Sequence, residues 1–156
     1  MAKEIERKFL VTGEGWRALA EAAVSMRQFY LDAEPDRSVR VRIRDGAALL
    51  TLKFGVHARV RDEFEYAIPL ADAEEMLDFA VGCVVEKTRY NVRHGGHLYE
   101  VDVFGGDLTG LVMAELETPE DVPNSALPAW LGREVTGQTE FYNASLALHG
   151  RPGEVA

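Results

Sequence analysis

The chain has 156 residues, the length of one ordinary domain, and its 17 Lys and Arg against 26 Asp and Glu leave a formal net charge of −9. The 47% hydrophobic fraction is enough for a buried core, while the acidic balance argues against a nucleic-acid binder, which needs a basic surface. The apolar runs are too short for a membrane helix or a signal peptide, and the single Cys83 excludes an internal disulfide and a multi-Cys zinc site. We therefore expect one cytoplasmic domain over residues 1–150 with a disordered tail over 151–156, no membrane or nucleic-acid partner, and either a monomer or a homodimer.

Alternation of apolar and charged residues predicts β-strands along most of the chain. Bounded by Gly, Pro or Asp, the expected strands are 2–11, 25–33, 38–45, 48–55, 59–69, 84–94, 97–104 and 111–118. Asp45-Gly46 and Gly95-Gly96 each suit a two-residue hairpin turn, which joins antiparallel neighbours. The fold class that follows is α+β, mainly β.

Helices are expected in three places, and one irregular connector separates the last strand from the last helix. Apolar spacing predicts helices over Gly15–Ala23, Ala71–Val81 and Gln138–His149. Three prolines, Pro119, Pro123 and Pro128, predict irregular structure over 119–132.

Seven of the eight expected strands carry one face that is almost entirely ionised. The acidic members are Glu4, Glu6, Glu63, Glu65, Glu100, Asp102, Glu115 and Glu117, and the basic members are Lys8, Arg40, Arg42, Arg44, Lys53, Arg61, Lys87 and Arg89. A half-exposed sheet normally alternates apolar residues with a mixture of polar ones, so this purity needs a physical reason.

Two arrangements are compatible with the charged faces. They can form a solvated outer surface, in which each cross-strand ion pair contributes about 0.2–1 kcal/mol. Alternatively, they can line a closed barrel, whose interior cannot be dry because each desolvated ion costs several kcal/mol against a total stability of about 5–15 kcal/mol. Clustered carboxylates bind hard divalent cations and clustered Arg and Lys bind phosphate oxygens, so the second arrangement predicts a metal-chelated oligophosphate as ligand.

A series of charged motifs in a fixed order carries a family resemblance. The motifs are Glu4-Ile5-Glu6-Arg7-Lys8, Arg40-x-Arg42, Thr51-Leu52-Lys53, Arg61-x-Glu63-x-Glu65, Glu86-Lys87-Thr88-Arg89-Tyr90, Glu100-x-Asp102-x-Phe104 and Glu115-x-Glu117. Together they resemble the CYTH domain, or triphosphate tunnel metalloenzyme, superfamily, and in particular its short bacterial inorganic triphosphatases. Arg27-Gln28-x-Tyr30-Leu31 in the second strand adds to the resemblance.

The resemblance implies an eight-stranded antiparallel closed barrel, or tunnel, with helices packed outside and a C-terminal plug helix at Gln138–His149. The phosphate-binding residues that it implies are Lys8, Arg40, Arg42, Lys53, Lys87 and Arg89. The metal ligands that it implies, for two Mg²⁺ or Mn²⁺ ions, are Glu4, Glu6, Glu63, Glu65, Asp102, Glu115 and Glu117. For catalysis it implies Lys8 together with a proton-accepting carboxylate from Glu4, Glu6 or Glu63. In the family the plug helix contributes a Lys or Arg, whereas here neither residue occurs between Arg133 and Arg151.

The activity implied by the resemblance is metal-dependent hydrolysis of a linear triphosphate, inorganic tripolyphosphate first, to pyrophosphate and phosphate. Three alternatives stay open at this point: a class IV adenylyl cyclase, a thiamine triphosphatase, and a non-catalytic polyphosphate- or nucleotide-binding module. The organic end of a nucleotide or of thiamine needs a stacking or hydrogen-bonding platform, and nothing in the sequence gives any aromatic residue that role.

Overall fold

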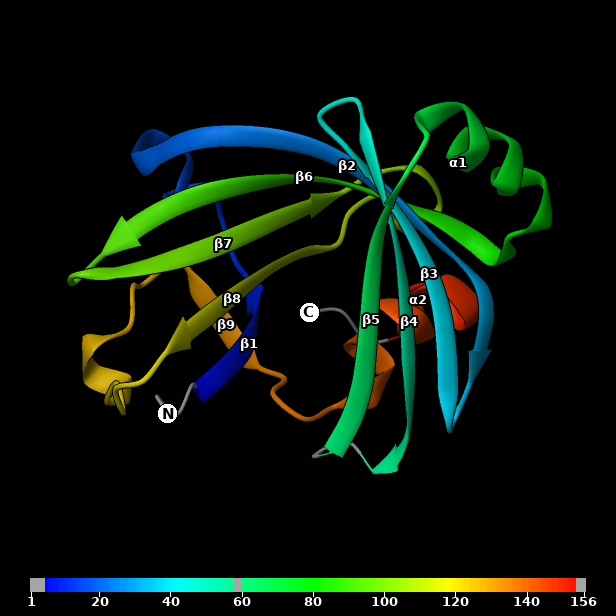
Figure 1. Cartoon of the computed structure of the whole chain (residues 1–156). Helices are drawn as coiled ribbons and strands as arrows, with labels where there is room; N and C mark the ends of the chain where they lie inside the picture. Colours follow the sequence, from blue (N-terminus) through cyan, green and yellow to red (C-terminus); the bar gives the residue numbers. More distant parts are fainter. Residues whose placement is uncertain (1–4, 58–59, 154–156) are drawn as a thin grey trace.

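The computed structural model describes residues 5–57 and 60–153, and within them one antiparallel sheet dominates the fold (Figure 1). Its nine strands are β1 Ile5–Val11, β2 Ala20–Glu34, β3 Arg37–Arg44, β4 Ala47–His57, β5 Val60–Ile68, β6 Val81–His94, β7 His97–Phe104, β8 Val112–Thr118 and β9 Leu131–Glu134. The α-helices are α1 Leu70–Met76 and α2 Asn143–His149. Short 3₁₀ turns occur at η1 Arg17–Leu19, η2 Leu77–Phe79, η3 Gly106–Leu108, η4 Asn124–Ala126 and η5 Thr139–Phe141.

The strands follow the order β5-β4-β3-β2-β6-β7-β8-β1-β9 across the sheet. The two predicted hairpins are confirmed: β3 pairs with β4 through Asp45-Gly46, and β6 pairs with β7 through Gly95-Gly96, with positive φ at all four turn residues. The sheet is completed by three pairings between distant segments, β2 with β6, β1 with β8 and β1 with β9.

The predicted closed barrel of eight strands is wrong in both strand number and closure. An additional strand, β9, pairs with the outer side of β1 through Phe9↔Glu134 and Val11↔Leu131. It follows the proline-containing connector, whose prolines end before the strand begins and therefore do not prevent the pairing. Because β9 occupies the edge of β1 that β5 would need for closure, the sheet in the described residues ends at β5 on one side and β9 on the other.

The predicted helix at Gly15–Ala23 is also wrong. Only Arg17–Leu19 forms a 3₁₀ turn, and β2 begins at Ala20, which pairs with Val92 of β6. Here sheet pairing overrides the helical preference of an alanine-rich segment. The other two predicted helices exist in shorter form, because Leu77–Phe79 and Thr139–Phe141 are 3₁₀ turns. None of the described helices is long and apolar enough to cross a membrane.

Two apolar clusters cover the convex face of the sheet, as expected. One packs α1 against β2, β3 and β4 through residues such as Ala73, Phe29 and Val41. The other packs Trp16 and Trp130 against β6, β7 and β8. The charged side chains of the strands point to the opposite, concave face.

The concave face is not ionised throughout, which differs from the prediction. A third apolar cluster joins Leu10, Phe104 and Met113 of the sheet to Phe141 and Leu146 near the C-terminus. In this way η5 and α2 close one part of the concave face with apolar packing, and the charged residues are confined to the remainder.

Candidate functional site

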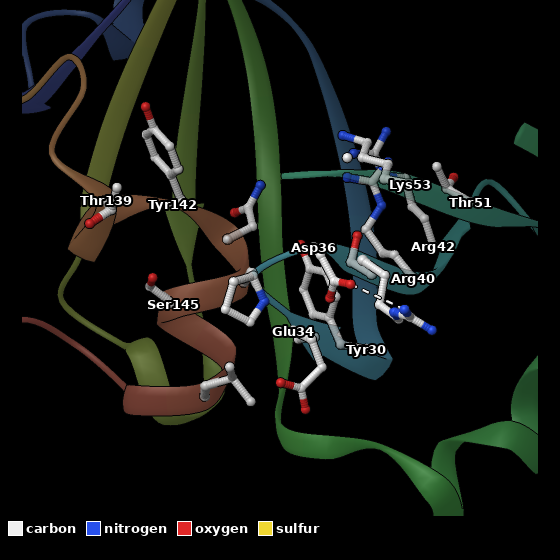
Figure 2. A pocket seen from close by; sticks show the side chains of 18 of the residues that line it. Tyr30, Glu34, Asp36, Arg40, Arg42, Thr51, Lys53, Thr139, Tyr142 and Ser145 are labelled. Atoms are coloured by element: carbon white, nitrogen blue, oxygen red, sulfur yellow. Dashed lines mark hydrogen bonds and ion pairs between the residues drawn. The ribbon is translucent and has the colours of Figure 1, made fainter. Parts of the chain in front are cut away.

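The candidate site is a cavity of about 720 Å³ on the concave face, between the sheet and α2 (Figure 2). Its ionised lining residues are Glu6, Lys8, Glu34, Asp36, Arg37, Arg40, Arg42, Lys53, Arg89 and Glu115. Seven predicted site residues therefore line this cavity: Glu6, Lys8, Arg40, Arg42, Lys53, Arg89 and Glu115. The side chains of Arg40, Arg42 and Lys53 lie together on one wall in Figure 2, opposite Thr139 and Tyr142.

Arg40 and Arg42 reach the cavity because alternate residues of β3 point to the same face of the sheet. Arg42 Nε donates a hydrogen bond of 3.3 Å to Gln28 Oε1 on the neighbouring strand β2. Burial and the adjacent charge of Arg40 lower the pKa of Arg42 below its ordinary value. Within the described structure, Arg40 Nε and Gln28 Nε2 are buried N–H donors without a hydrogen-bond partner. Arg40 lines the cavity and Gln28 does not, so this wall presents the Arg40 donor and positive charge that an oxyanion would satisfy.

Arg89 is held by a buried carboxylate beneath the cavity. Asp102 Oδ1 accepts a hydrogen bond of 2.7 Å from Arg89 Nε, and Asp102 Oδ2 accepts one of 2.8 Å from Arg89 Nη2. Lys87 Nζ donates to the same Oδ2 at 3.0 Å, with only 1% of the Lys87 side chain exposed. Asp102 thereby joins two cations, of which Arg89 lines the cavity.

The ionisation of this cluster follows from its burial and its charges. Burial lowers the pKa of Lys87, with Asp102 opposing the shift. Burial alone would raise the pKa of Asp102, but the hydrogen bonds from Arg89 and the charge of Lys87 hold it below its ordinary value. Burial acts to lower the pKa of Arg89, and the hydrogen bonds and charge of Asp102 overcome it, so that the pKa is raised.

The pairing of β1 with β8 brings carboxylates and a lysine to one face. Glu6 is opposite Glu117, and Lys8 is opposite Glu115. Lys8 Nζ lies 3.5 Å from Glu115 Oε1 and 4.8 Å from the ring centroid of Tyr142, which precedes α2. Glu6 and Glu115 both line the cavity, and their oxygens are the hard donors that divalent cations prefer.

The remaining predicted site residues are placed elsewhere or lie outside the described residues. Glu63 and Glu65 are exposed on β5, the strand at the sheet edge, where Thr51 Oγ1 donates to Glu65 Oε2 at 3.3 Å. The cavity lining found in the described residues does not include Glu63, Glu65, Lys87, Asp102 or Glu117. Glu4 lies outside the residues that the structure describes.

A metal site is not preformed in the described part of the chain, where no three His, Cys, Asp or Glu side chains are grouped to hold an ion. The donor chemistry of Glu6 and Glu115 nevertheless fits a divalent cation whose remaining ligands come from phosphate oxygens and water. Asp102 fits this role less well, because both of its oxygens already accept hydrogen bonds from cations.

Sequence reasoning missed several neutral and acidic residues of the cavity. They are Tyr30, Glu34, Asp36, Thr139, Tyr142, Asn143 and Ser145. Tyr30 could have been found from strand register, since β2 places it opposite Arg40. The residues near α2 carry no charge pattern, and only the packing of Phe141 and Leu146 brings them to the cavity.

The comparisons with known proteins identify the family. The CYTH domain model matches residues 2–148, and the chain belongs to this family. It is 42% identical over 147 residues to an inorganic triphosphatase of Acetivibrio thermocellus, covering 94% of each chain, and 38% identical over 150 residues to one of Nitrosomonas europaea, covering 93% of this chain and 97% of the relative. The crystal structure of the inorganic triphosphatase NE1496 is similar with a TM-score of 0.74 and 34% identity, over 95% of this chain and 96% of that one.

Proposed function

We propose that the protein hydrolyses inorganic tripolyphosphate to pyrophosphate and phosphate. The observation that carries the proposal is the convergence of cations from four strands on one cavity: Lys8, Arg40, Arg42, Lys53 and Arg89. The naming of two relatives as inorganic triphosphatases, each matched over more than nine-tenths of this chain, supports the same substrate. If these charges only formed a solvated outer surface, the buried Nε of Arg40, which lines the cavity and has no hydrogen-bond partner among the described residues, would be unexplained.

The residues of the cavity suit phosphoryl transfer, which depends on positioning and on neutralising charge. Arg40, Arg42 and Lys53 bind the phosphate oxygens from one wall, where the buried Nε donor of Arg40 gains an acceptor. Arg89 contributes charge from below and is kept in place by Asp102. In this proposal Lys87 stabilises the Asp102 carboxylate and does not contact substrate.

The enzyme is proposed to require a divalent cation, Mg²⁺ or Mn²⁺, held by Glu6 and Glu115 with Glu117 beside them in register. Such an ion supplies Lewis-acid neutralisation of the phosphates and lowers the pKa of a coordinated water. Glu63 and Glu65, on the opposite edge strand, are candidates to hold a second ion or, for Glu63, to accept a proton from the attacking water. Glu4 keeps the same proposed roles, as ligand or proton acceptor, from outside the described residues.

A phosphate-release panel tests the proposal. The purified protein is incubated with tripolyphosphate, ATP, thiamine triphosphate and pyrophosphate, each with Mg²⁺, Mn²⁺ or EDTA, and the products are separated. We expect the highest kcat/KM for tripolyphosphate, equimolar pyrophosphate and phosphate as products, and no turnover in EDTA. Cyclic AMP from ATP would instead indicate a cyclase, and tight tripolyphosphate binding without release would indicate a binding module.

A pair of arginine variants tests whether the cavity is the site. Arg42→Gln removes a cavity charge, while Arg93→Gln removes an exposed charge that pairs with Glu21 on the sheet surface. We expect at least about a tenfold loss of kcat/KM for Arg42→Gln, since hydrogen bonds between charged groups contribute about 1.5–3 kcal/mol. Arg93→Gln is expected to retain wild-type activity. Equal losses in both variants would place the site elsewhere.

A further inference from the structure

The lysine of β1 is held between two chemically different partners. Lys8 Nζ lies 3.5 Å from the carboxylate of Glu115 and 4.8 Å from the ring centroid of Tyr142, and 10% of the Lys8 side chain is exposed. An ammonium group with so little contact with water needs attraction from the protein to compensate for lost hydration. The face of an aromatic ring provides such attraction, and the attraction grows as water is excluded.

The carboxylate partner is the one that a divalent cation would also use. If Glu115 binds the metal, as the proposed function requires, the cation neutralises part of the carboxylate charge and the attraction between Glu115 and Lys8 weakens. The ring of Tyr142 keeps its attraction in that state, because it carries no charge that the metal neutralises. It also adds no negative charge to a cavity that must receive a polyanion.

The backbone around Tyr142 is well placed to hold the ring at this position. Tyr142 N donates to Thr139 O at 3.0 Å, and Tyr142 O accepts from Leu146 N at 2.9 Å. The two residues that anchor this segment, Phe141 and Leu146, are buried in the apolar cluster beneath α2. Tyr142 lines the cavity on the side across from Arg40, Arg42 and Lys53 (Figure 2).

We propose that Tyr142 is a positioning residue that holds the Lys8 ammonium in the cavity through its ring face and so sets the affinity for the triphosphate substrate. The proposal rests on the proposed triphosphatase function. It assigns the effect to the ring and to Lys8, and it therefore differs from a role in which the Tyr142 hydroxyl binds phosphate directly.

Three variants separate these roles. Tyr142→Phe keeps the ring and removes the hydroxyl, Tyr142→Leu removes the ring and keeps apolar bulk, and Lys8→Met removes the cation. Tyr66→Leu is the matched control, since Tyr66 is an exposed tyrosine on β5 in register with Leu50 of the convex cluster. KM and kcat for tripolyphosphate with Mg²⁺ are measured for each protein.

We expect Tyr142→Phe and Tyr66→Leu to keep KM within about twofold of the wild type. Tyr142→Leu is expected to raise KM about 5- to 30-fold with a smaller change in kcat, which is the fold-change that an interaction of about 1–2 kcal/mol gives. In the Lys8→Met background, Tyr142→Leu is expected to have no further effect on KM. Equal damage from Tyr142→Phe would overturn the proposal in favour of the hydroxyl.

Urea unfolding without ligand gives a second readout that does not depend on substrate binding. The wild type, Tyr142→Leu, Lys8→Met and the double variant form a cycle in which contacting residues give non-additive effects. Additive unfolding midpoints would overturn the contact between Lys8 and Tyr142. If the wild type itself does not hydrolyse tripolyphosphate, the proposed function fails, whereas an active wild type with unchanged Tyr142→Leu kinetics contradicts only this inference.

Discussion

Replacing Asp102 by Asn is expected to destabilise the protein by about 3–5 kcal/mol, the usual cost of removing one partner from a buried ion pair. Asp102 accepts hydrogen bonds of 2.7, 2.8 and 3.0 Å from Arg89 and Lys87. The amide introduced by Asp102→Asn has nearly the same shape but loses the charge, and it turns a donor toward cations that are themselves donors. Lys87, at 1% exposure, then keeps a buried positive charge without its counter-ion.

Glu100→Gln is the matched control for this change. Glu100 accepts a longer hydrogen bond, 3.3 Å, from the same arginine, Arg89, and 35% of its side chain is exposed. An ion pair with that much contact with water contributes about 0–1 kcal/mol. The two variants remove the same formal charge next to the same arginine; they differ in burial and in the second cation, Lys87, which only Asp102 binds.

Urea unfolding followed by circular dichroism measures both variants. A difference of about 2 kcal/mol or more between them corresponds to a midpoint shift of about 1 M when the urea dependence is near 2 kcal/mol/M. Adding Lys87→Met to Asp102→Asn is expected to recover part of the loss, because an apolar side chain then replaces the unpaired buried cation. If Asp102→Asn costs no more than Glu100→Gln, the assignment of Asp102 as the buried counter-ion of this cluster is refuted.

Three further outcomes are expected. Gly82→Ala should lower the urea unfolding midpoint well below that of Gly13→Ala. Both glycines have positive φ, but an added Cβ at Gly82 would overlap Ala147 O of α2, whereas at Gly13 it would meet nothing within 4 Å. Equal midpoints would contradict the docking of α2 on β6. Acid should destabilise the wild type more steeply than Asp102→Asn. The pKa of Asp102 in the folded state lies below its ordinary 3.8, so the stabilisation from the Asp102 carboxylate is complete above pH 3.8 and is lost as the pH falls through the folded-state pKa. Parallel profiles of stability against pH for the two proteins would refute this. Tripolyphosphate with Mg²⁺ should raise the melting temperature of the wild type and raise it less for Lys53→Ala, which removes a cavity cation, and equal shifts would argue against binding there.

The charged wall of the cavity could be predicted from sequence because strand alternation fixes which side chains share a face. Arg40 and Arg42 of β3 had to point together, and the hairpin through Asp45-Gly46 sets their strand beside β4 and Lys53. The family resemblance extended this order to Lys8 and Glu115, which register brings opposite each other across β1 and β8. These predictions depend on local geometry and on short connections.

The open edge of the sheet, by contrast, had no local signal. Either β5 or another segment distant in sequence could pair with the free edge of β1, and in the structure the short strand β9, Leu131–Glu134, forms that pair. Arg7 strengthens that pairing through a 2.7 Å ion pair with Glu134, a contact between residues far apart in sequence. The apolar packing of η5 and α2 was predictable only in part: apolar spacing indicated a helix at Gln138–His149, but strand alternation described the face that it covers as ionised.

The order of the strands has a consequence for how the cavity forms during folding. Lys8 and Glu115 meet only when β1 pairs with β8, and Tyr142 joins them from a segment still later in the chain. Closing contacts over such long stretches of sequence is slow, because much chain entropy is lost before the contacts are gained. During synthesis, Lys8 therefore meets Glu115 and Tyr142 only after nearly the whole chain has left the ribosome, and until then the unpaired edges of β1 are open to pairing with wrong partners.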